Sequence, residues 1–197
     1  MKVQVPLNQA LRMILPGVVG LITTHYRGRY DITTVSWMCP VGREPPLVAI
    51  AVHPSTMAYD TIRRSNEFVI NIPTLDVINQ VVSCGRLSGN DVDKFQRTGL
   101  RMAEPKVVTT PHLEQCIGHL ECAVINASTP GDHVIFVAQI AYASVEQEAF
   151  ADGWLLLEKM SKPLHHVGGA TFAILEGQID ATPPDIKEAL AAKREEP

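Results

Sequence analysis

The sequence predicts a mainly β domain, an antiparallel barrel with helices at its periphery. Six or seven segments are rich in Val, Ile and Thr and are bounded by Pro and Gly. Most connections between them are too short to hold the helices of a parallel sheet. We expect a single domain over residues 1–180 and a charged tail over residues 181–197.

The composition suits a folded protein and disfavours two classes of partner. Hydrophobic residues make up 46% of the chain and charged residues 19%, with a net charge of −4. Without a basic stripe, nucleic acid is not an expected partner. The longest apolar run, Leu47 to Val52, is too short to span a bilayer, so no membrane partner is expected. The N-terminus lacks the apolar core of a signal peptide, so a cytoplasmic protein is expected.

Breakers and apolar spacing set the elements of the first half. Pro16-Gly17 ends a short amphipathic helix. Ser55 or Thr56 is a candidate N-cap for the helix that follows the third strand. The expected elements are a helix at 6–15, strands at 18–24, 31–38 and 47–52, a turn at 42–46, a helix within 53–65 and a strand at 67–72.

The second half is expected to add one longer helix and three strands. Asp76 near its start and Gly85 at its end favour a helix at 75–84. Residues 154–164 are ambiguous. The other expected elements are a loop with a helical turn at 88–95, an extended segment at 105–111, and strands at 117–127, 133–146 and 171–175.

The cysteines do not predict a metal site. Cys116 and Cys122 flank His119, a spacing that could suggest metal ligands, but Cys122 lies in a strand-like run. Buried free thiols are common in proteins of reducing compartments. No two of the four cysteines, which also include Cys39 and Cys84, have the C-x-x-C spacing. We expect no metal.

The common nucleotide-binding and hydrolase motifs are absent from the sequence. There is no Walker A sequence, no G-x-G-x-x-G, no G-x-S-x-G and no H-E-x-x-H. A catalytic triad could be assembled from Ser36, His133 and Asp132, but no nucleophile elbow supports it, so hydrolysis is disfavoured.

Hydroxyl side chains gather near the ends of two predicted strands. Thr33, Thr34 and Ser36 form one group, and Ser55 and Thr56 the other. Hydroxyls and free backbone amides in such places can recognise a phosphate. Thr is equally a normal strand residue, and Ser-Thr after Pro is a normal helix cap, so both interpretations stay open.

Several segments in this order and spacing resemble one family. They are TTVSW, PPLVAIAV, EFVINIP, SGNDVDKF, HLECAV and GDHVIFVAQI. Residues 6–177 resemble the flavin reductase-like FMN-binding split-barrel family, and its flavoredoxin branch in particular. The resemblance implies a split β-barrel, a homodimer, and one FMN per subunit near the dimer interface.

The resemblance also implies the residues that would hold FMN. His133 would lie beside the isoalloxazine and the nicotinamide approach and act in catalysis, Lys94 would reach the cofactor, and the loop from His53 to Ala58 would lie near the phosphate. The full set is Asp31, Thr34, Val35, Ser36, Trp37, His53, Pro54, Ser55, Thr56, Ala58, Ser88, Gly89, Lys94, Phe95, His133 and Phe172.

Two of these positions depart from the family pattern. Asp31 stands where the family usually has Asn, and a carboxylate facing the phosphate would repel it. Ala58 stands where the family often has Thr, and a lost hydroxyl contact costs about 1–3 kcal/mol. The sequence therefore predicts that Asp31→Asn tightens FMN binding, unless Asp31 pairs with Arg27 or Arg29.

The resulting expectation is an FMN-binding oxidoreductase of flavin reductase type. It would pass electrons from NAD(P)H through flavin to an acceptor, with the nicotinamide stacked on the flavin because no Rossmann fingerprint is present. Two alternatives are a flavoredoxin-type electron-transfer protein with a protein redox partner, and a split-barrel protein with weakened FMN binding.

Overall fold

The computed structural model describes residues 2–151, 153–156, 162–177, 179 and 181 of the chain. Apart from Ala181, the predicted C-terminal tail lies outside the described residues. So do residues 157–161, the middle of the segment that the sequence left ambiguous.

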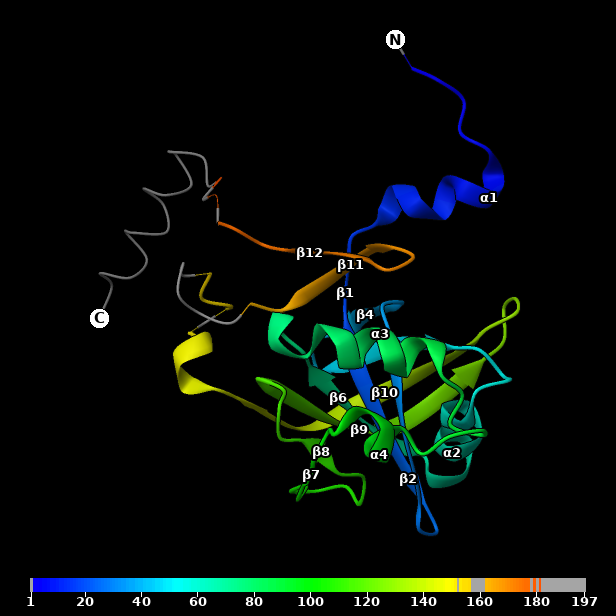
Figure 1. The fold of residues 1–197 in the computed structure, drawn as a ribbon, viewed down its shortest axis with the longest axis vertical. Coiled ribbons are helices and arrows are strands. Elements are labelled where there is room, and N and C mark those ends of the chain that lie inside the picture. The colour runs from blue at the N-terminus through cyan, green and yellow to red at the C-terminus, as the bar shows by residue number, and fades with distance from the viewer. Residues whose placement is uncertain (1, 152, 157–161, 178, 180, 182–197) are drawn as a thin grey trace.

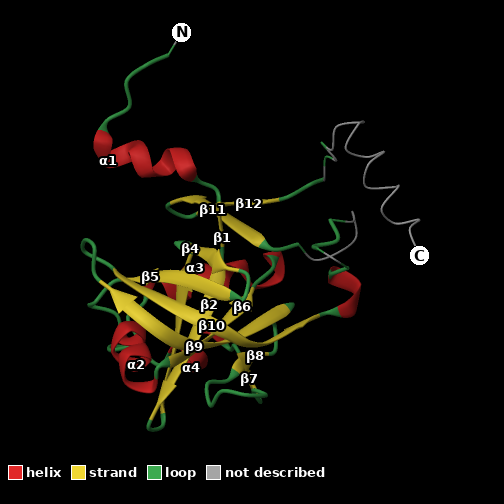
Figure 2. Cartoon of the chain, turned by 180° about the vertical axis from the view of Figure 1, so that it is seen from behind, coloured by secondary structure: helices red, strands yellow, loops and turns green. Residues whose placement is uncertain are grey.

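A seven-stranded antiparallel sheet forms the body of the molecule, in the order β3-β2-β6-β9-β10-β5-β4. Figure 2 shows its strands from the side opposite α3. The mainly β prediction is confirmed. The strands are β2 (Gly20–Tyr26), β3 (Arg29–Val35), β4 (Met38–Gly42), β5 (Leu47–Val52), β6 (Glu67–Ile72), β9 (Gly118–Ser128) and β10 (Val134–Val145).

Two small sheets flank this body. A three-stranded sheet has the order β1-β11-β12, and a two-stranded one joins β7 to β8. Figure 1 shows β11 and β12 between the large sheet and the N-terminal helix. The bounds are β1 (Gly17–Val18), β7 (Met102–Ala103), β8 (His112–Leu113), β11 (Leu164–Gly168) and β12 (Thr171–Ile174).

The helices lie around the sheet, as the sequence predicts. They are α1 (Leu7–Ala10), which continues as a 3₁₀ turn over Leu11–Ile14, α2 (Met57–Ser65), α3 (Ile78–Arg86) and α4 (Lys94–Thr98), with further 3₁₀ turns at Leu75–Val77 and Gln147–Ala149. In both views α1 stands clear of the large sheet. None of the described helices is long and apolar enough to cross a bilayer.

Local capping explains where α2 begins. The Thr56 hydroxyl accepts a hydrogen bond from the backbone N–H of Tyr59 at 3.2 Å, so Thr56 is the N-cap. At the other end Asn66 adopts a left-handed conformation with φ 56° and closes the helix. One of the two predicted caps is thereby confirmed.

Three predicted boundaries are wrong. The strand expected at 31–38 ends at Val35, and Met38–Gly42 forms a separate strand, β4, that was not predicted. The turn predicted at 42–46 follows β4. β4 is an edge strand with a register shift between Pro40 and Gly42. An edge tolerates Pro40, because a missing N–H there breaks no ladder bond. The helix predicted at 75–84 is a 3₁₀ turn at Leu75–Val77 followed by α3, which ends at Arg86, two residues past the predicted end at Cys84.

The segment predicted to be extended, 105–111, has no regular structure. The buried Glu121 carboxylate holds it by accepting hydrogen bonds from the backbone N–H groups of Lys106, Val107 and Val108 at 2.6–2.9 Å. His112 Nε2 lies 2.7 Å from the same carboxylate and stacks on His119, with ring centroids 4.4 Å apart. The backbone N–H groups of this segment therefore bond to a side chain and not to a neighbouring strand.

Two apolar cores lie on opposite faces of the sheet. One contains Ile22, Ile50, Phe68 and Phe136, with Ile62 of α2 packed into it. The other contains Leu21, Ile32 and Leu113, covered by Val81 and Cys84 of α3. Successive residues of β2 enter different cores, which is the alternation expected for a strand covered on both faces.

Candidate functional site

A cleft of ≈ 290 Å³ opens where β3 and β5 end. It brings together seven of the predicted site residues, namely Thr34, Val35, Ser36, Trp37, His53, Thr56 and His133. Thr33, which belongs to the hydroxyl group noted from the sequence, also lines it, and so do three residues that were not predicted, namely Ala51, Val52 and Gly85. Segments distant in sequence therefore converge on one place.

The main chain of β3 borders this cleft. β3 is an edge strand of the large sheet, so within the part of the chain that the structure describes one side of its backbone has no neighbouring strand. The Ile32 carbonyl faces that side, since it accepts a hydrogen bond from Lys94 Nζ at 2.7 Å. Because backbone groups alternate in direction along a strand, the N–H and C=O of Thr34 face the same side. The edge thus offers a donor and an acceptor beside the cleft.

Aromatic rings gather at the mouth of the cleft. Trp37 is 45% exposed, and its ring centroid lies 4.8 Å from that of His133. The His53 and His133 rings meet edge to face at 5.2 Å. His133 Nδ1 lies 2.7 Å from Asp132 Oδ1, and this hydrogen bond lowers the pKa of the Asp132 carboxyl. The exposed rings suit contact with a flat, aromatic ligand.

The hydroxyls predicted to contact phosphate also serve the fold. Thr34 Oγ1 donates to the Val81 carbonyl at 2.6 Å, which ties β3 to α3. Ser55 Oγ lies 2.7 Å from His53 Nδ1, and Thr56 Oγ1 donates to the His53 carbonyl at 2.8 Å. The hydroxyl protons of Thr34 and Thr56 are therefore already donated within the fold, which favours the structural interpretation of these two side chains.

Ser36 lies where three hollows meet. It lines the cleft, a hollow of ≈ 180 Å³ beside α3 and β11, and a groove of ≈ 540 Å³ that runs from the 3₁₀ turn after α1 to β5. Its Oγ is 3.2 Å from His166 Nδ1. The triad of Ser36, His133 and Asp132 is therefore not assembled, because the histidine beside Ser36 is His166.

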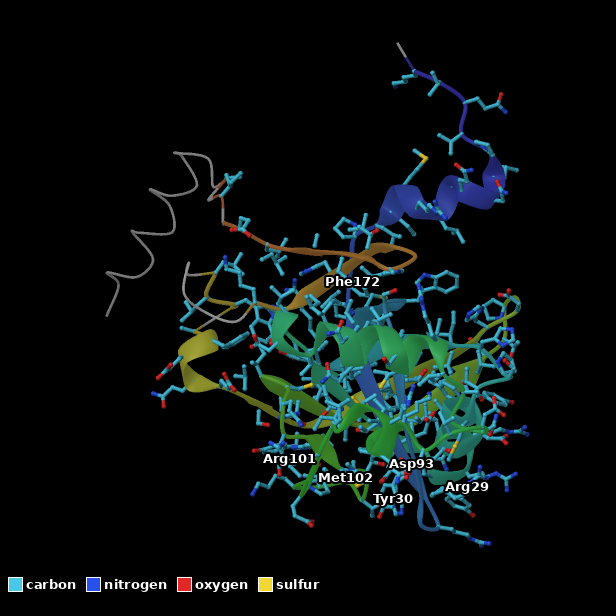
Figure 3. The ribbon with its side chains drawn as sticks, in the orientation of Figure 1. Arg29, Tyr30, Asp93, Arg101, Met102 and Phe172 are labelled. Atoms are coloured by element: carbon cyan, nitrogen blue, oxygen red, sulfur yellow. The ribbon has the colours of Figure 1, made fainter. Side chains whose placement is uncertain are left out.

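Phe172 lies outside the cleft, in the hollow beside α3. It shares that hollow with Arg86 and His166, and its ring centroid lies 5.4 Å from that of His166. Figure 3 shows Phe172 at the β11–β12 hairpin, over α3. The two hollows share Thr34, Ser36 and Gly85, so Phe172 borders a neighbouring compartment of the same surface.

Asp31 and Lys94 form a buried ion pair instead of facing the cleft. Lys94 Nζ lies 3.1 Å from Asp31 Oδ1, and both side chains are at most 3% exposed. Burial raises the pKa of the Asp31 carboxyl, and Lys94 opposes that rise. The pairing of Asp31 with Arg27 or Arg29, weighed from the sequence, is not the one found.

Four further predicted residues contribute to the scaffold around the cleft. A Cβ on Gly89 would lie 2.3 Å from Asp31 Oδ1, so only glycine lets this loop approach β3 so closely. Ala58 is fully buried in the core, and Phe95 packs against the other core. Ser88 Oγ accepts from the Asn90 N–H at 3.2 Å and shapes the loop.

Pro54 and Ser55 precede the N-cap of α2 and do not line the described cleft. They turn the chain from β5 into α2.

The described residues contain no group of three His, Cys, Asp or Glu side chains that could hold a metal ion. Cys116 and Cys122 are buried, and burial raises the pKa of each thiol to about 12. His119, between them in sequence, pairs with Asn71 Oδ1 at 3.0 Å.

Sequence reasoning missed Gly85, although it noted the residue as a helix end. A Cβ there would lie 3.3 Å from Thr34 Cβ, so the glycine lets α3 approach β3 beside the cleft. The sequence indicated only that a small residue lies near the end of a predicted helix. Ala51 and Val52 gave no signal beyond that of ordinary strand residues, whereas Thr33 belonged to the hydroxyl group noted from the sequence.

Comparisons with known proteins agree on one family. The model of the flavin reductase like domain matches residues 12–173. YddH of Escherichia coli K12, described as uncharacterized, is 30% identical over 184 residues, which cover 91% of this chain and 97% of YddH.

Two solved structures share the fold. The flavoredoxin of Desulfovibrio vulgaris (Miyazaki F) superposes with a TM-score of 0.81 at 20% identity, covering 95% of this chain and 100% of that one. An FMN-binding protein from Thermus thermophilus gives a TM-score of 0.78 at 20% identity, covering 91% of this chain and 98% of that one.

Proposed function

This chain belongs to the flavin reductase-like family, and from that premise we propose that it is an FMN-binding oxidoreductase. It passes electrons from NAD(P)H through the flavin to an acceptor. The observation that carries the proposal is the cleft at the end of β3, where a free backbone edge, the exposed ring of Trp37 and the half-buried ring of His133 meet.

The residues present fit a flavin. A flavin ring has flat apolar faces and one edge of alternating hydrogen-bond donors and acceptors. The cleft offers the N–H and C=O of Thr34 for that edge, and Trp37 for a face. When bound, FMN supplies the redox chemistry, and the chain binds it, orients it and controls access of water.

His133 is the residue we propose to act beside the flavin. Its Nδ1 is occupied by Asp132, which fixes the ring and leaves Nε2 to hold or release a proton at the cleft. The neighbouring His53 is fixed by Ser55 and limits how far the His133 ring can turn.

We also propose that the protein works as a homodimer. The arm formed by α1 and its 3₁₀ turn exposes Leu7, Leu11, Met13 and Ile14, all at least 59% exposed. Leu11 and Ile14 line the groove of ≈ 540 Å³ that reaches Ser36 and Trp37. A second copy covering this apolar surface would bring the dimer interface to the cleft.

Anaerobic titration tests the proposed function. We expect purified protein mixed with FMN to bind the flavin and to bleach its visible absorption when NADH or NADPH is added. His133→Asn should slow this reduction by about 10²-fold or more without abolishing flavin binding, whereas His25→Asn, on the β2–β3 hairpin, should leave the rate unchanged.

Two outcomes would contradict the proposal. Flavin that binds but is reduced only by a protein donor would favour the flavoredoxin-type carrier. Protein that binds no flavin at micromolar concentration would favour a split-barrel protein with weakened FMN binding.

A further inference from the structure

His166 joins two segments beside the cleft through the two nitrogens of its ring. It lies in β11, and its Nδ1 is 3.2 Å from the hydroxyl oxygen of Ser36, the residue that follows β3. Its Nε2 is 3.1 Å from the carbonyl oxygen of Gly169, in the turn between β11 and β12. Figure 1 shows this hairpin over α3. The ring is therefore held between the end of β3 and its own hairpin.

The packing of β1 and β12 keeps Ser36 and His166 together. Gly17 of β1 is the pairing partner of His166 in the small sheet. A Cβ on Gly17 would lie 2.8 Å from the Ser36 carbonyl oxygen, so a side chain there would push β1 away from Ser36. Phe172, the partner of His166 on β12, places its ring centroid 5.4 Å from that of His166. The contact between Ser36 and His166 is thus fixed by neighbours on both sides of β11.

The Gly169 carbonyl determines which ring nitrogen of neutral His166 carries the proton. A carbonyl oxygen can only accept a hydrogen bond, so Nε2 is the donor. Neutral imidazole has a single N–H, which leaves a lone pair on Nδ1. The Ser36 hydroxyl therefore donates its proton to Nδ1 and presents only oxygen lone pairs to the cleft.

A proton added to His166 reverses this hydrogen bond. The imidazolium ring donates from both of its nitrogens. Nδ1 then donates to the Ser36 oxygen, and the hydroxyl proton of Ser36 is free to point into the cleft. One side chain thus offers the cleft an acceptor in one state of His166 and a donor in the other.

Near the His166 ring itself, the one permanent charge in the described lining of its hollow is Arg86 of α3. Its guanidinium stays protonated throughout the usable pH range, so its charge does not change when a histidine titrates. His165 precedes His166 in β11 and faces the opposite side of the strand.

Three further titratable groups lie on the cleft side of Ser36. His53 and His133 line the cleft with Ser36, and Asp132 lines the large groove with it. Asp132 and His133 are hydrogen-bonded to each other. Because all three remain in place in variants at positions 36 and 166, such variants isolate the contribution of the Ser36–His166 pair.

We propose that His166 is a positioning residue that sets, through Ser36, whether the cleft offers a hydrogen-bond acceptor or a donor to the ring bound there. The proposal rests on the proposed flavin chemistry. The polar edge of an oxidised flavin carries one N–H and several acceptor atoms. A donating Ser36 suits those acceptors, so oxidised flavin is bound more tightly when His166 is protonated.

The pH dependence of riboflavin binding tests this proposal. Riboflavin is the probe because it has no phosphate, and its ring does not titrate where histidine does. Dissociation constants are measured at about pH 5.5 and about pH 8, on either side of the ordinary histidine pKa. The test variants are His166→Phe, which keeps a ring beside Phe172, and Ser36→Ala. The matched control is His165→Phe, which removes an imidazole from the same strand and leaves the Ser36–His166 contact in place.

We expect the ratio of the two dissociation constants to differ between two groups of proteins. The wild type and His165→Phe should gain about three- to tenfold more affinity at the lower pH than His166→Phe or Ser36→Ala. The double variant should give the same ratio as either single test variant. A purely structural role of His166 would change affinity equally at both pH values. The same ratio in all the proteins overturns the proposal while leaving flavin binding intact.

Nitrogen-15 NMR of the flavin-free protein separates this proposal from the proposed function. At about pH 8 the His166 ring should carry its proton on Nε2, and Ser36→Ala should shift the Nδ1 resonance. Neutral His166 with its proton on Nδ1 would overturn the proposal, because Ser36 would then already accept. If the protein binds no riboflavin, the proposed function fails, and this spectrum still supports or overturns the assigned direction of the hydrogen bond.

Discussion

Asp31 and Lys94 depend on each other because both are buried. The Asp31 carboxylate lies 3.1 Å from Lys94 Nζ, which also donates to the Ile32 carbonyl. Removing one member of a buried pair leaves an uncompensated charge, which costs about 3–5 kcal/mol. The charge of Asp31 is thus balanced within the fold, and the sequence-based reason for expecting repulsion of a flavin phosphate is removed.

We therefore predict that Asp31→Asn destabilises the protein and does not tighten FMN binding. Unfolding in urea should show a loss of about 3 kcal/mol, and Lys94→Met should behave similarly. The double variant Asp31→Asn with Lys94→Met should recover most of the loss, because neither charge is then left alone. Tighter FMN binding by Asp31→Asn at low salt would show instead that Asp31 faces the cofactor.

His119 is predicted to make the protein sensitive to acid. Burial, together with His112, lowers the pKa of His119 to about 4, whereas its ordinary value is 6.5. Between these values the unfolded chain binds more protons than the folded one. The stabilisation from neutral His119 is therefore present above pH 6.5 and lost as the pH falls toward 4.

A comparison of His119→Gln with the wild type tests this. Because His119 is partly exposed, we expect the pH-dependent loss of stability between pH 7 and pH 4.5 to be only about 1–2 kcal/mol smaller in the variant. Urea unfolding at both pH values measures it. If the two proteins lose stability equally as the pH falls, the loss comes from another group, such as the buried Glu121 carboxylate beside His112, and not from His119.

At the scale of single elements, the N-terminus of α2 is capped by one hydroxyl, that of Thr56. Thr56→Ala removes the cap contact to the Tyr59 N–H and should lower the free energy of unfolding by about 1 kcal/mol. Ser55→Ala is the matched control, since Ser55 contacts His53 and does not cap α2. Equal losses in the two variants would assign the effect to the loop and not to the cap.

Local patterns predicted the elements best where the chain supplies its own boundaries. The predicted strands at 47–52 and 67–72 match β5 and β6 residue for residue. Pro46 and His53-Pro54 bound the first, and Asn66 and Pro73 bound the second. By contrast, β4 is a short edge strand interrupted by Pro40, and β11 depends partly on pairing with the distant β1, so a local pattern reveals neither of them.

The site was predicted in the same uneven way. Thr34, Ser36, Trp37 and His133 do meet in the cleft, as the resemblance implies. The pairing of Asp31 with Lys94 joins residues 63 positions apart along the chain, through a contact made only by folding. Side-chain pairs of this kind decide whether a charge faces a ligand, and no periodicity reveals them.

At the scale of the whole molecule, the apolar arm predicts dimer formation. Leu11 is 59% exposed and lines the large groove, so Leu11→Asp should place a charge in the interface and shift the protein toward a 21.6 kDa monomer. Sedimentation velocity at micromolar concentration measures this. Val107→Asp, on the 105–111 segment, is the control and should remain dimeric.

A wild type that sediments as a monomer would contradict dimer formation altogether. An unchanged dimer in Leu11→Asp would place the interface on another surface, away from α1.

The position of Ser36 at the meeting of three hollows limits how this surface can vary. A substitution at Trp37 alters the cleft and the large groove, and one at Gly85 alters the cleft and the hollow beside α3. A substitution at Ser36 alters all three at once. Substitutions meant to change one of these hollows alone should therefore be made at positions that line only that hollow, such as Arg86. Ser36 should be left unchanged, because its substitution would alter all three.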